Sequence, residues 1–237
     1  MNSKLKNTSV HTSELNTNAR RRFWSVTQDP EIRAYLQLAD DHLEAIGFTE
    51  HGIRHGSRVA DGAHQILSQL GRGDEEQELA WLAGFLHDTG NFVCRTNHGQ
   101  TGASLLYPIL QRLGLTPREL GLVLSAIGNH EEQYDQVYNS ICAAVMIADK
   151  ADVHRSRVRD YDPGKGDIHD DVNYAVTRST LKVDSSLKVI TLELELDPNI
   201  ATVMDYFEIF MSRMVMCKNA AEYLGCTFVI TSNGTSD

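Results

Sequence analysis

Cysteine is scarce in this sequence and carries no pairing pattern. Its four copies are Cys94, Cys142, Cys217 and Cys226, and no two of them form a Cys-x-x-Cys motif. Small secreted domains that depend on disulfides carry cysteines at paired spacings. Because that spacing is missing and two of these residues lie in apolar runs, we expect reduced thiols and a protein of the cytoplasm.

Long hydrophobic runs are missing as well. The longest uninterrupted apolar stretch covers residues 141–148, far fewer than the ~20 residues that a membrane-spanning helix needs. The beginning of the sequence also lacks the hydrophobic segment of a signal peptide. We therefore expect no association with a membrane and a location in the cytoplasm.

Positive charge is in deficit. The sequence has 22 Lys and Arg against 32 Asp and Glu, which gives a formal net charge of −10. No basic stripe runs along it, so nucleic acid is not expected as a general ligand. An acidic protein can still bind a small anion where metal ions dominate the local field. The charge therefore leaves small anionic ligands open.

Three regions follow one another along the 237 residues. Residues 1–27 are rich in Ser, Thr and Asn and have no apolar period, which predicts a mobile N-terminal tail. Residues 28–160 carry helical periods and begin at Asp29-Pro30, a helix cap followed by proline at the first helical position. Residues 161–237 mix strand and helix patterns, and no internal repeat is evident.

The third region predicts a small ββαβ unit packed on the helices. Residues 187–196 alternate between apolar and polar side chains as a strand does, and residues 180–183 are their expected partner. Asp197-Pro198 should cap a long helix, and residues 226–231 form a last strand. In the long helix, Met and Phe residues three and four apart predict core packing or a homodimer contact. A unit of this size should not stand alone.

Polar residues stand at the ends of hydrophobic helices in the middle region. The most informative pair is His87-Asp88, which closes the apolar helical run of residues 78–86. Burying an ionised carboxylate there is costly unless a cation or a set of donors compensates it. Because His and Asp are both good ligands, a metal ion explains the pair economically. A second copy, His169-Asp170, lies in a polar stretch and has no such context.

Histidines and a further aspartate occupy the other helix ends. His51 and His55 are four residues apart and share a helix face, so both could approach one centre, although His51 could equally be a hydrogen-bonded structural residue. His98 opens an amphipathic helix, His130 follows another, and Asp149 lies near the end of an apolar one. Helix ends that converge on a polar pocket are how helical bundles build metal sites. The sequence therefore predicts a metal site inside a bundle.

The order of these residues resembles the HD-domain superfamily of metal-dependent phosphohydrolases over about residues 50–155. Residues 85–90, Phe-Leu-His-Asp-Thr-Gly, are similar to its central His-Asp-x-Gly segment, and residues 98–106 to its His-x-x-x-Gly-Ala helix. Residues 126–130 and 147–152 together resemble the end of bacterial dinucleoside-tetraphosphate hydrolases of this superfamily. Cyclic-di-GMP phosphodiesterases have a tandem His-His pair where residues 129–130 are Asn-His, so a cyclic dinucleotide is not expected.

The resemblance implies a mainly α fold, in which an HD-type helical bundle carries the ββαβ appendage. It further implies two divalent transition-metal ions with Asp88 as the bridge between them. One ion would be held by His55, His87, Asp88 and Asp149, and the other by Asp88, His98 and His130. Mixed imidazole and carboxylate ligands suit Mn, Fe, Zn, Ni or Co better than Ca or an all-oxygen Mg cage.

The activity that the resemblance implies is hydrolysis of a phosphate ester or anhydride in a small metabolite or nucleotide. Two metals roughly 3.5–4 Å apart can activate a water and steady the phosphoryl oxygens together, which places His87 and Asp88 in the catalytic centre. Lys150, Arg155 and Arg159 are expected on one continuing helix, where they would neutralise the phosphate of the substrate. A solvated charged face is the alternative for these three residues.

Neighbouring charges carry further alternatives. Arg157 should point away from Arg155 and Arg159, which favours a solvated position for it. Asp152, one turn after Asp149, either positions a leaving group or pairs with Arg155.

Two other functions remain open. The same ligand set resembles the diiron oxygenases of the HD superfamily, in which the metals activate O₂, although Lys150, Arg155 and Arg159 favour a phosphate substrate. The other alternative is a regulator that binds a nucleotide without turning it over. Metal analysis and electron paramagnetic resonance distinguish the oxygenase, and ligand-induced stabilisation without product distinguishes the regulator.

Overall fold

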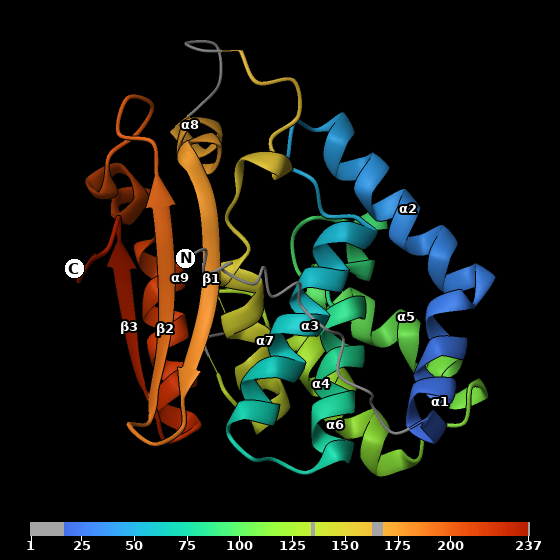
Figure 1. Cartoon of the computed structure of the whole chain (residues 1–237). Coiled ribbons are helices and arrows are strands. Elements are labelled where there is room, and N and C mark those ends of the chain that lie inside the picture. The colour runs from blue at the N-terminus through green and yellow to red at the C-terminus, as the bar shows by residue number, and fades with distance from the viewer. Residues whose placement is uncertain (1–16, 134–135, 163–167, 237) are drawn as a thin grey trace, which may run out of the picture.

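The computed structural model describes residues 17–133, 136–162 and 168–236, which fold into a helical bundle with a small sheet on one side (Figure 1). In chain order the helical elements of the bundle are α1 (Thr17–Gln28), α2 (Pro30–Ala45), α3 (Ile53–Gln69), α4 (Asp74–Leu86), the 3-10 turn η1 (Thr89–Phe92), α5 (His98–Arg112), α6 (Pro117–Gly128), α7 (Ser140–Ala151) and the 3-10 turn η2 (Arg155–Arg157). The expected mainly α fold is confirmed.

Local sequence explains where two of these helices begin. The Asp29 carboxylate accepts hydrogen bonds from the backbone N–H groups of Glu31 (3.0 Å) and Ile32 (3.3 Å) at the start of α2. At the start of α6, Thr116 and Glu119 form a reciprocal capping box. Both caps satisfy N–H groups that have no partner inside the helix.

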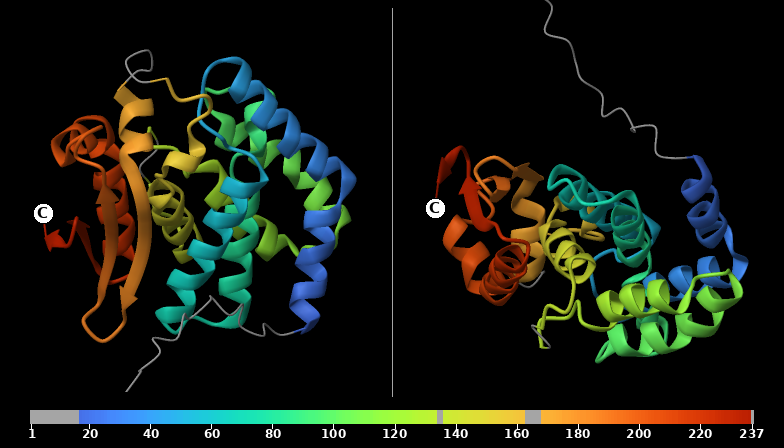
Figure 2. Two further views of the ribbon diagram at one scale, coloured as in Figure 1. Left: turned by 45° about the horizontal axis from the view of Figure 1, so that its top comes forward. Right: turned by 90° about the horizontal axis from the view of Figure 1, so that it is seen from below.

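Helix α7 lies at the centre of the molecule. It packs between α3, α4 and α6 of the bundle and the long C-terminal helix α9 (Val203–Tyr223), as Figure 2 shows from two directions. All of residues 141–148 are buried. A helix that is apolar all round is one that is surrounded by protein, so this position explains the longest apolar run of the sequence.

The C-terminal part is a four-stranded sheet with α9 on one face (Figure 1). Its strands lie in the order β1 (Val176–Asp184), β2 (Val189–Leu196), β3 (Thr227–Ser232) and β4 (Thr235–Ser236), and α8 (Ile168–Ala175) precedes β1. The first two strands form an antiparallel hairpin, and β3 joins β2 in parallel after the crossover through α9. The predicted ββαβ order is confirmed, with β4 as a short additional strand.

Two predicted boundaries are wrong. The tail expected over residues 1–27 includes α1, whose Phe23 and Val26 are buried in the core; residues 1–16 lie outside the described residues. The long helix starts at Val203 and not at Asp197-Pro198, because Thr202 forms a capping box with Asp205.

The predicted continuation of α7 through residue 159 is also wrong. The helix ends at Ala151, and Asp152 has a non-helical backbone with φ −82° and ψ 66°. Arg155 therefore lies in η2, and Arg159 lies beyond it. The side chains of these two arginines are no longer neighbours on one helix face.

The apolar stripe of α9 is divided between core and surface. Phe210 and Met214 are buried, whereas Met204 and Met211 are 70% and 52% exposed. The core packing predicted for this helix is thus present on one side, and a homodimer contact stays a prediction.

Candidate metal centre

Six side chains from five helix ends meet in the interior of the bundle. The elements that carry them are the first turn of α3 (His55), the end of α4 (His87 and Asp88), the start of α5 (His98), the end of α6 (His130) and the last turn of α7 (Asp149). All but Asp149 are at most 5% exposed. The structure thus brings together all six residues that the sequence predicted as ligands.

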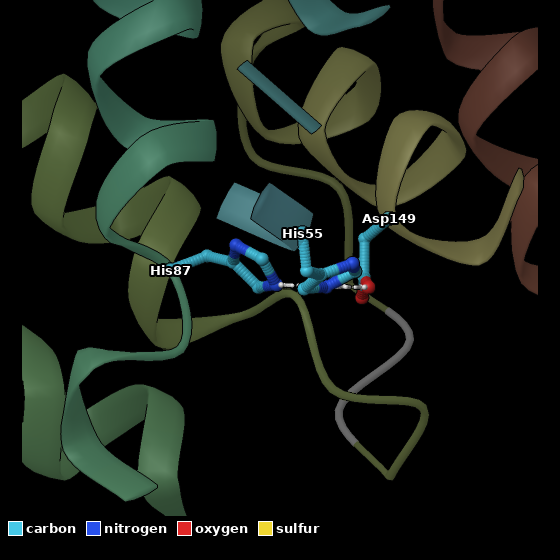
Figure 3. A group of neighbouring side chains, drawn as sticks. All are labelled: His55, His87 and Asp149. Carbon is cyan, nitrogen blue, oxygen red and sulfur yellow. Dashed lines mark hydrogen bonds and ion pairs between the residues drawn. The ribbon is translucent and has the colours of Figure 1, made fainter. Parts of the chain in front are cut away.

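The first group contains His55, His87 and Asp149, whose side chains point toward one another in Figure 3. The two Nε2 atoms of the histidines are 3.2 Å apart. Asp149 Oδ1 lies 3.3 Å from the Nε2 atom of His55 and 3.6 Å from that of His87. These three atoms are close enough together to bind one metal ion.

The second group contains His98 and His130, with Asp88 between the two groups. The Nε2 atoms of His98 and His130 are 2.9 Å apart, and Asp88 Oδ1 lies 3.0 Å and 3.8 Å from them. The other oxygen, Asp88 Oδ2, faces the first group at 3.3 Å from His87 Nε2 and 3.6 Å from His55 Nε2. The two oxygens of one carboxylate therefore face two different pairs of histidines, and His87, Asp88 and His130 also lie close enough together to bind one ion.

The outward nitrogens of the histidines are fixed by hydrogen bonds. His87 Nδ1 donates to the carbonyl oxygen of Gly84 (2.8 Å), and His130 Nδ1 donates to that of Ile127 (2.6 Å). Because a carbonyl oxygen only accepts, these Nδ1 atoms carry the proton, and the Nε2 atom of a neutral ring presents a lone pair to the centre.

Cations fit this arrangement. If all four rings are neutral with Nδ1 protonated, the Nε2 lone pairs of His55 and His87 face each other, and so do those of His98 and His130. Such an arrangement is repulsive unless a cation lies between the nitrogens. In addition, Asp88 Oδ2 is buried and has no hydrogen-bond partner within the described residues, a costly state for an ionised carboxylate. A positive ion in each group would satisfy nitrogen and oxygen atoms together. The donor set therefore fits divalent metal ions.

The pKa shifts in the cluster lead to the same conclusion. Burial lowers the pKa of His87, but the carboxylates of Asp88 and Asp149 outweigh burial and raise this pKa to about 10. Burial and the neighbouring His98 and His87 hold the pKa of His130 well below its usual value. His130 is thus kept neutral as a ligand should be, and a metal ion would compete with a proton for His87.

Two glycines allow the elements that carry the ligands to approach closely. A Cβ atom at Gly90 in η1 would clash with the carbonyl oxygen of His98 and would lie 2.6 Å from the backbone nitrogen of Gly102. A Cβ atom at Gly56 in α3 would lie 2.8 Å from the carbonyl oxygen of Phe85 in α4. Both positions adjoin ligands, so any larger residue would displace the ligands.

The three cations predicted to bind phosphate do not form one group. Lys150 is buried, and its Nζ atom pairs with Asp149 Oδ2 at 2.7 Å and with Glu132 Oε1 at 3.3 Å. Arg155 lies over the ring of Tyr174, 5.1 Å from its centroid. Arg159 pairs with acidic residues of α2, Asp40 at 2.5 Å and Glu44 at 3.4 Å. The single continuing helix predicted for these residues is wrong, because α7 ends at Ala151, and their contact with a phosphate stays a prediction.

The solvated position predicted for Arg157 is also wrong, as is the pairing of Asp152 with Arg155. Arg157, which was expected in solvent, is 5% exposed, and its guanidinium donates to the carbonyl oxygens of Asp152 (2.7 Å) and Glu50 (3.1 Å). Asp152 does not pair with Arg155, because its carboxylate accepts from His55 Nδ1 at 2.7 Å and from Arg58 Nε at 2.8 Å.

His51 stands apart from both groups of possible ligands. It precedes α3, which starts at Ile53, and does not share a helix face with His55. Its Nδ1 atom donates to the carbonyl oxygen of Thr49 at 2.5 Å, and its ring meets that of His55 edge-on at 5.4 Å. This contact corresponds to the hydrogen-bonded structural alternative.

A comparison with protein families finds that residues 52–155 match the HD domain. The segment contains all six candidate ligands, and the match confirms the resemblance inferred from the order of these residues. An HD domain indicates a protein of the metal-dependent hydrolase type. No curated protein matches the chain. Within the described ranges, none of the helices is long and apolar enough to cross a membrane.

Proposed function

We propose that this protein is a phosphohydrolase that uses two divalent metal ions to cleave a phosphate ester or anhydride in a small metabolite or nucleotide. The observation that carries the proposal is the position of Asp88, whose two oxygens face two separate groups of imidazole nitrogens. The HD domain at residues 52–155 supports the hydrolytic chemistry. The acidic net charge does not oppose an anionic substrate, since bound cations would dominate the local field.

The ligands would be oriented before the substrate arrives. Two divalent ions in these groups would supply hydroxide at neutral pH and neutralise phosphoryl oxygens. Asp88 would be the shared ligand that keeps them adjacent. Since His87 and His130 are held by hydrogen bonds to backbone carbonyl oxygens, their Nε2 atoms need no rearrangement to bind metal.

Lys150 would act through Asp149 and not on the phosphate. Its ammonium holds Asp149 Oδ2 at 2.7 Å, which leaves Oδ1 turned toward His55 and His87. A second carboxylate, Glu132, lies 3.3 Å from the same ammonium. Because two carboxylates already surround this charge, we propose that Lys150 orients a ligand.

A metal-dependent activity screen tests the proposed function. Protein loaded with Mn²⁺, Fe²⁺, Zn²⁺, Ni²⁺ or Co²⁺ is incubated with nucleotides, dinucleoside polyphosphates and sugar phosphates, and released phosphate or nucleotide is measured. We expect metal-dependent release from at least one class of substrate, and none from the Asp88→Ala variant. Metal-loaded protein that cleaves no compound in any class would overturn the proposal.

The same samples distinguish the two alternatives. Oxygen consumption by iron-loaded protein, without phosphate release, would identify an oxygenase. A nucleotide that raises the melting temperature but is recovered intact would identify a regulator, because binding to the folded state alone stabilises it.

A further inference from the structure

Asp152 stands behind His55, on the side away from the metal centre. Its Oδ2 atom accepts a hydrogen bond from His55 Nδ1 at 2.7 Å, and its Oδ1 atom accepts one from Arg58 Nε at 2.8 Å. The guanidinium groups of Arg54 and Arg157 lie 3.6 Å and 3.8 Å from Oδ2. Asp152 is 3% exposed, so an ionised carboxylate held by arginines lies directly behind this histidine.

Glu131 has the corresponding place behind His98. Its Oε2 atom lies 3.2 Å from His98 Nδ1, and its Oε1 atom accepts from the backbone N–H of Gly99 at 2.9 Å. The Arg95 carbonyl oxygen, at 2.9 Å, is a second acceptor for His98 Nδ1, and Arg95 Nη1 also lies 3.1 Å away. Because Nδ1 has two acceptors beside it, Glu131 Oε2 and the Arg95 carbonyl oxygen, and only one donor, Nδ1 carries the proton. The unprotonated Nε2 atom then faces Asp88.

The other two histidines differ in the charge behind them. His87 and His130 both donate to neutral backbone carbonyl oxygens. Each half of the centre therefore contains one histidine with a carboxylate behind it and one with a carbonyl group behind it. Asp152 belongs to the half of His55 and His87, and Glu131 belongs to the other half.

We propose that Asp152 and Glu131 are positioning residues that set the metal affinity of the two halves separately. The inference rests on the proposed two-metal centre. A carboxylate that accepts the outward N–H of a histidine fixes the orientation of the ring and makes its other nitrogen a stronger ligand, and loss of such a partner costs roughly 10–100-fold in metal affinity. Because neither carboxylate faces the centre itself, each effect should stay within one half.

The experiment measures each half alone with Co²⁺ as the probe. His98→Ala leaves the half that contains His55, and His55→Ala leaves the half that contains His98. In the first background, we expect Asp152→Asn to weaken Co²⁺ binding about 10–100-fold, while Glu131→Gln changes it by less than about twofold. In the second background, we expect Glu131→Gln to weaken Co²⁺ binding about 10–100-fold, while Asp152→Asn changes it by less than about twofold. Titration followed by visible absorption gives both affinities.

Arg58→Ala provides a matched control. It removes the half-exposed partner of Asp152 Oδ1 but leaves the His55–Asp152 hydrogen bond, so Co²⁺ affinity should stay within about twofold. A merely structural role of Asp152 would weaken both halves together and lower the melting temperature of the metal-free protein. Such a common loss, or unchanged affinity in Asp152→Asn, overturns the inference. Wild-type protein that binds no Co²⁺ would instead refute the metal centre.

Discussion

Asp88 is the residue that both halves of the centre share. Its oxygens lie 3.0 Å from His98 Nε2 and 3.3 Å from His87 Nε2. We expect Asp88→Ala to lose most bound metal and all metal-dependent activity together, because its removal takes the bridging charge from both ions. Metal content per chain, measured by elemental analysis after dialysis against metal-free buffer, checks this expectation.

The second His-Asp pair of the sequence provides the control for that variant. Asp170 follows His169 in α8 and is not among the candidate ligands, so Asp170→Ala should keep both metal and activity. A loss of metal in Asp170→Ala equal to that in Asp88→Ala would mean that the measurement reports general damage.

Arg159 was expected to bind the phosphate of the substrate, but it forms ion pairs with α2 instead. Its ion pairs with Asp40 and Glu44 attach the segment after η2 to α2. Since its side chain is 27% exposed, we expect Arg159→Ala to cost about 0–1 kcal/mol of unfolding free energy and to leave kcat and KM within about twofold. Steady-state kinetics on any substrate found in the screen, together with urea unfolding, measure both quantities; a large rise in KM alone would restore its phosphate role.

The six candidate ligands could be predicted from sequence because they stand at the ends of apolar helices in an order that resembles the HD-domain superfamily. His87-Asp88, after the buried residues of α4, is the clearest case. Asp152 gave no comparable signal, because its role depends on contacts with His55 and Arg58, 97 and 94 residues away in the chain. Spacing along a helix cannot show such contacts.

At the scale of elements, the close packing of η1 against α5 holds Asp88 beside His98. Gly90→Ala would place a Cβ atom against the carbonyl oxygen of His98. We expect this variant to lose roughly 1–3 kcal/mol of stability, as overpacked sites do, and to bind the second metal more weakly because His98 moves. Thermal unfolding and Co²⁺ titration give the two effects.

Gly121 in α6 provides the matched glycine. A Cβ atom there would meet nothing within 4 Å, so Gly121→Ala should stabilise the helix by about 0.5–1 kcal/mol and leave metal binding unchanged. If Gly90→Ala behaves in the same way as Gly121→Ala, the close approach does not constrain the centre.

The element boundaries show where local patterns suffice. Asp29 caps α2 as the Asp29-Pro30 pair predicted, and Thr116 caps α6. Before α9, the Asp197 carboxylate accepts a hydrogen bond from the backbone N–H of Asn199 at 3.0 Å, but the turn that it caps does not continue into a helix. The cap of α9 is Thr202, five residues later.

For the whole molecule, the centre joins helices that are far apart in sequence, so metal removal should weaken the fold. The ligands come from α3, α4, α5, α6 and α7, and bound cations would join these helices at one point. At a metal concentration 100 times the Kd, binding at one site raises the free energy of unfolding by about 2.7 kcal/mol. This corresponds to a rise of about 5–10 °C in melting temperature for a chain of this size. Thermal unfolding with and without a chelator tests this effect.

The overall architecture was accessible from sequence because α7 and the strands carry clear patterns. The fully apolar run of residues 141–148 predicted an apolar helix, and that helix is buried at the centre. The alternation in β2 predicted a half-buried strand, and Ile190, Leu192 and Leu194 face the core. The buried residues of the bundle and of the C-terminal part form one continuous core, a property that depends on tertiary packing and has no local signature.

The central claim is that two metal ions are bound on opposite sides of Asp88. The most direct measurement is anomalous scattering from a crystal of the protein grown with Mn²⁺. We expect two anomalous peaks roughly 3.5–4 Å apart, one beside His55, His87 and Asp149, and the other beside His98 and His130. A single peak at full Mn²⁺ occupancy, or no peak next to Asp88, would contradict the two-metal account.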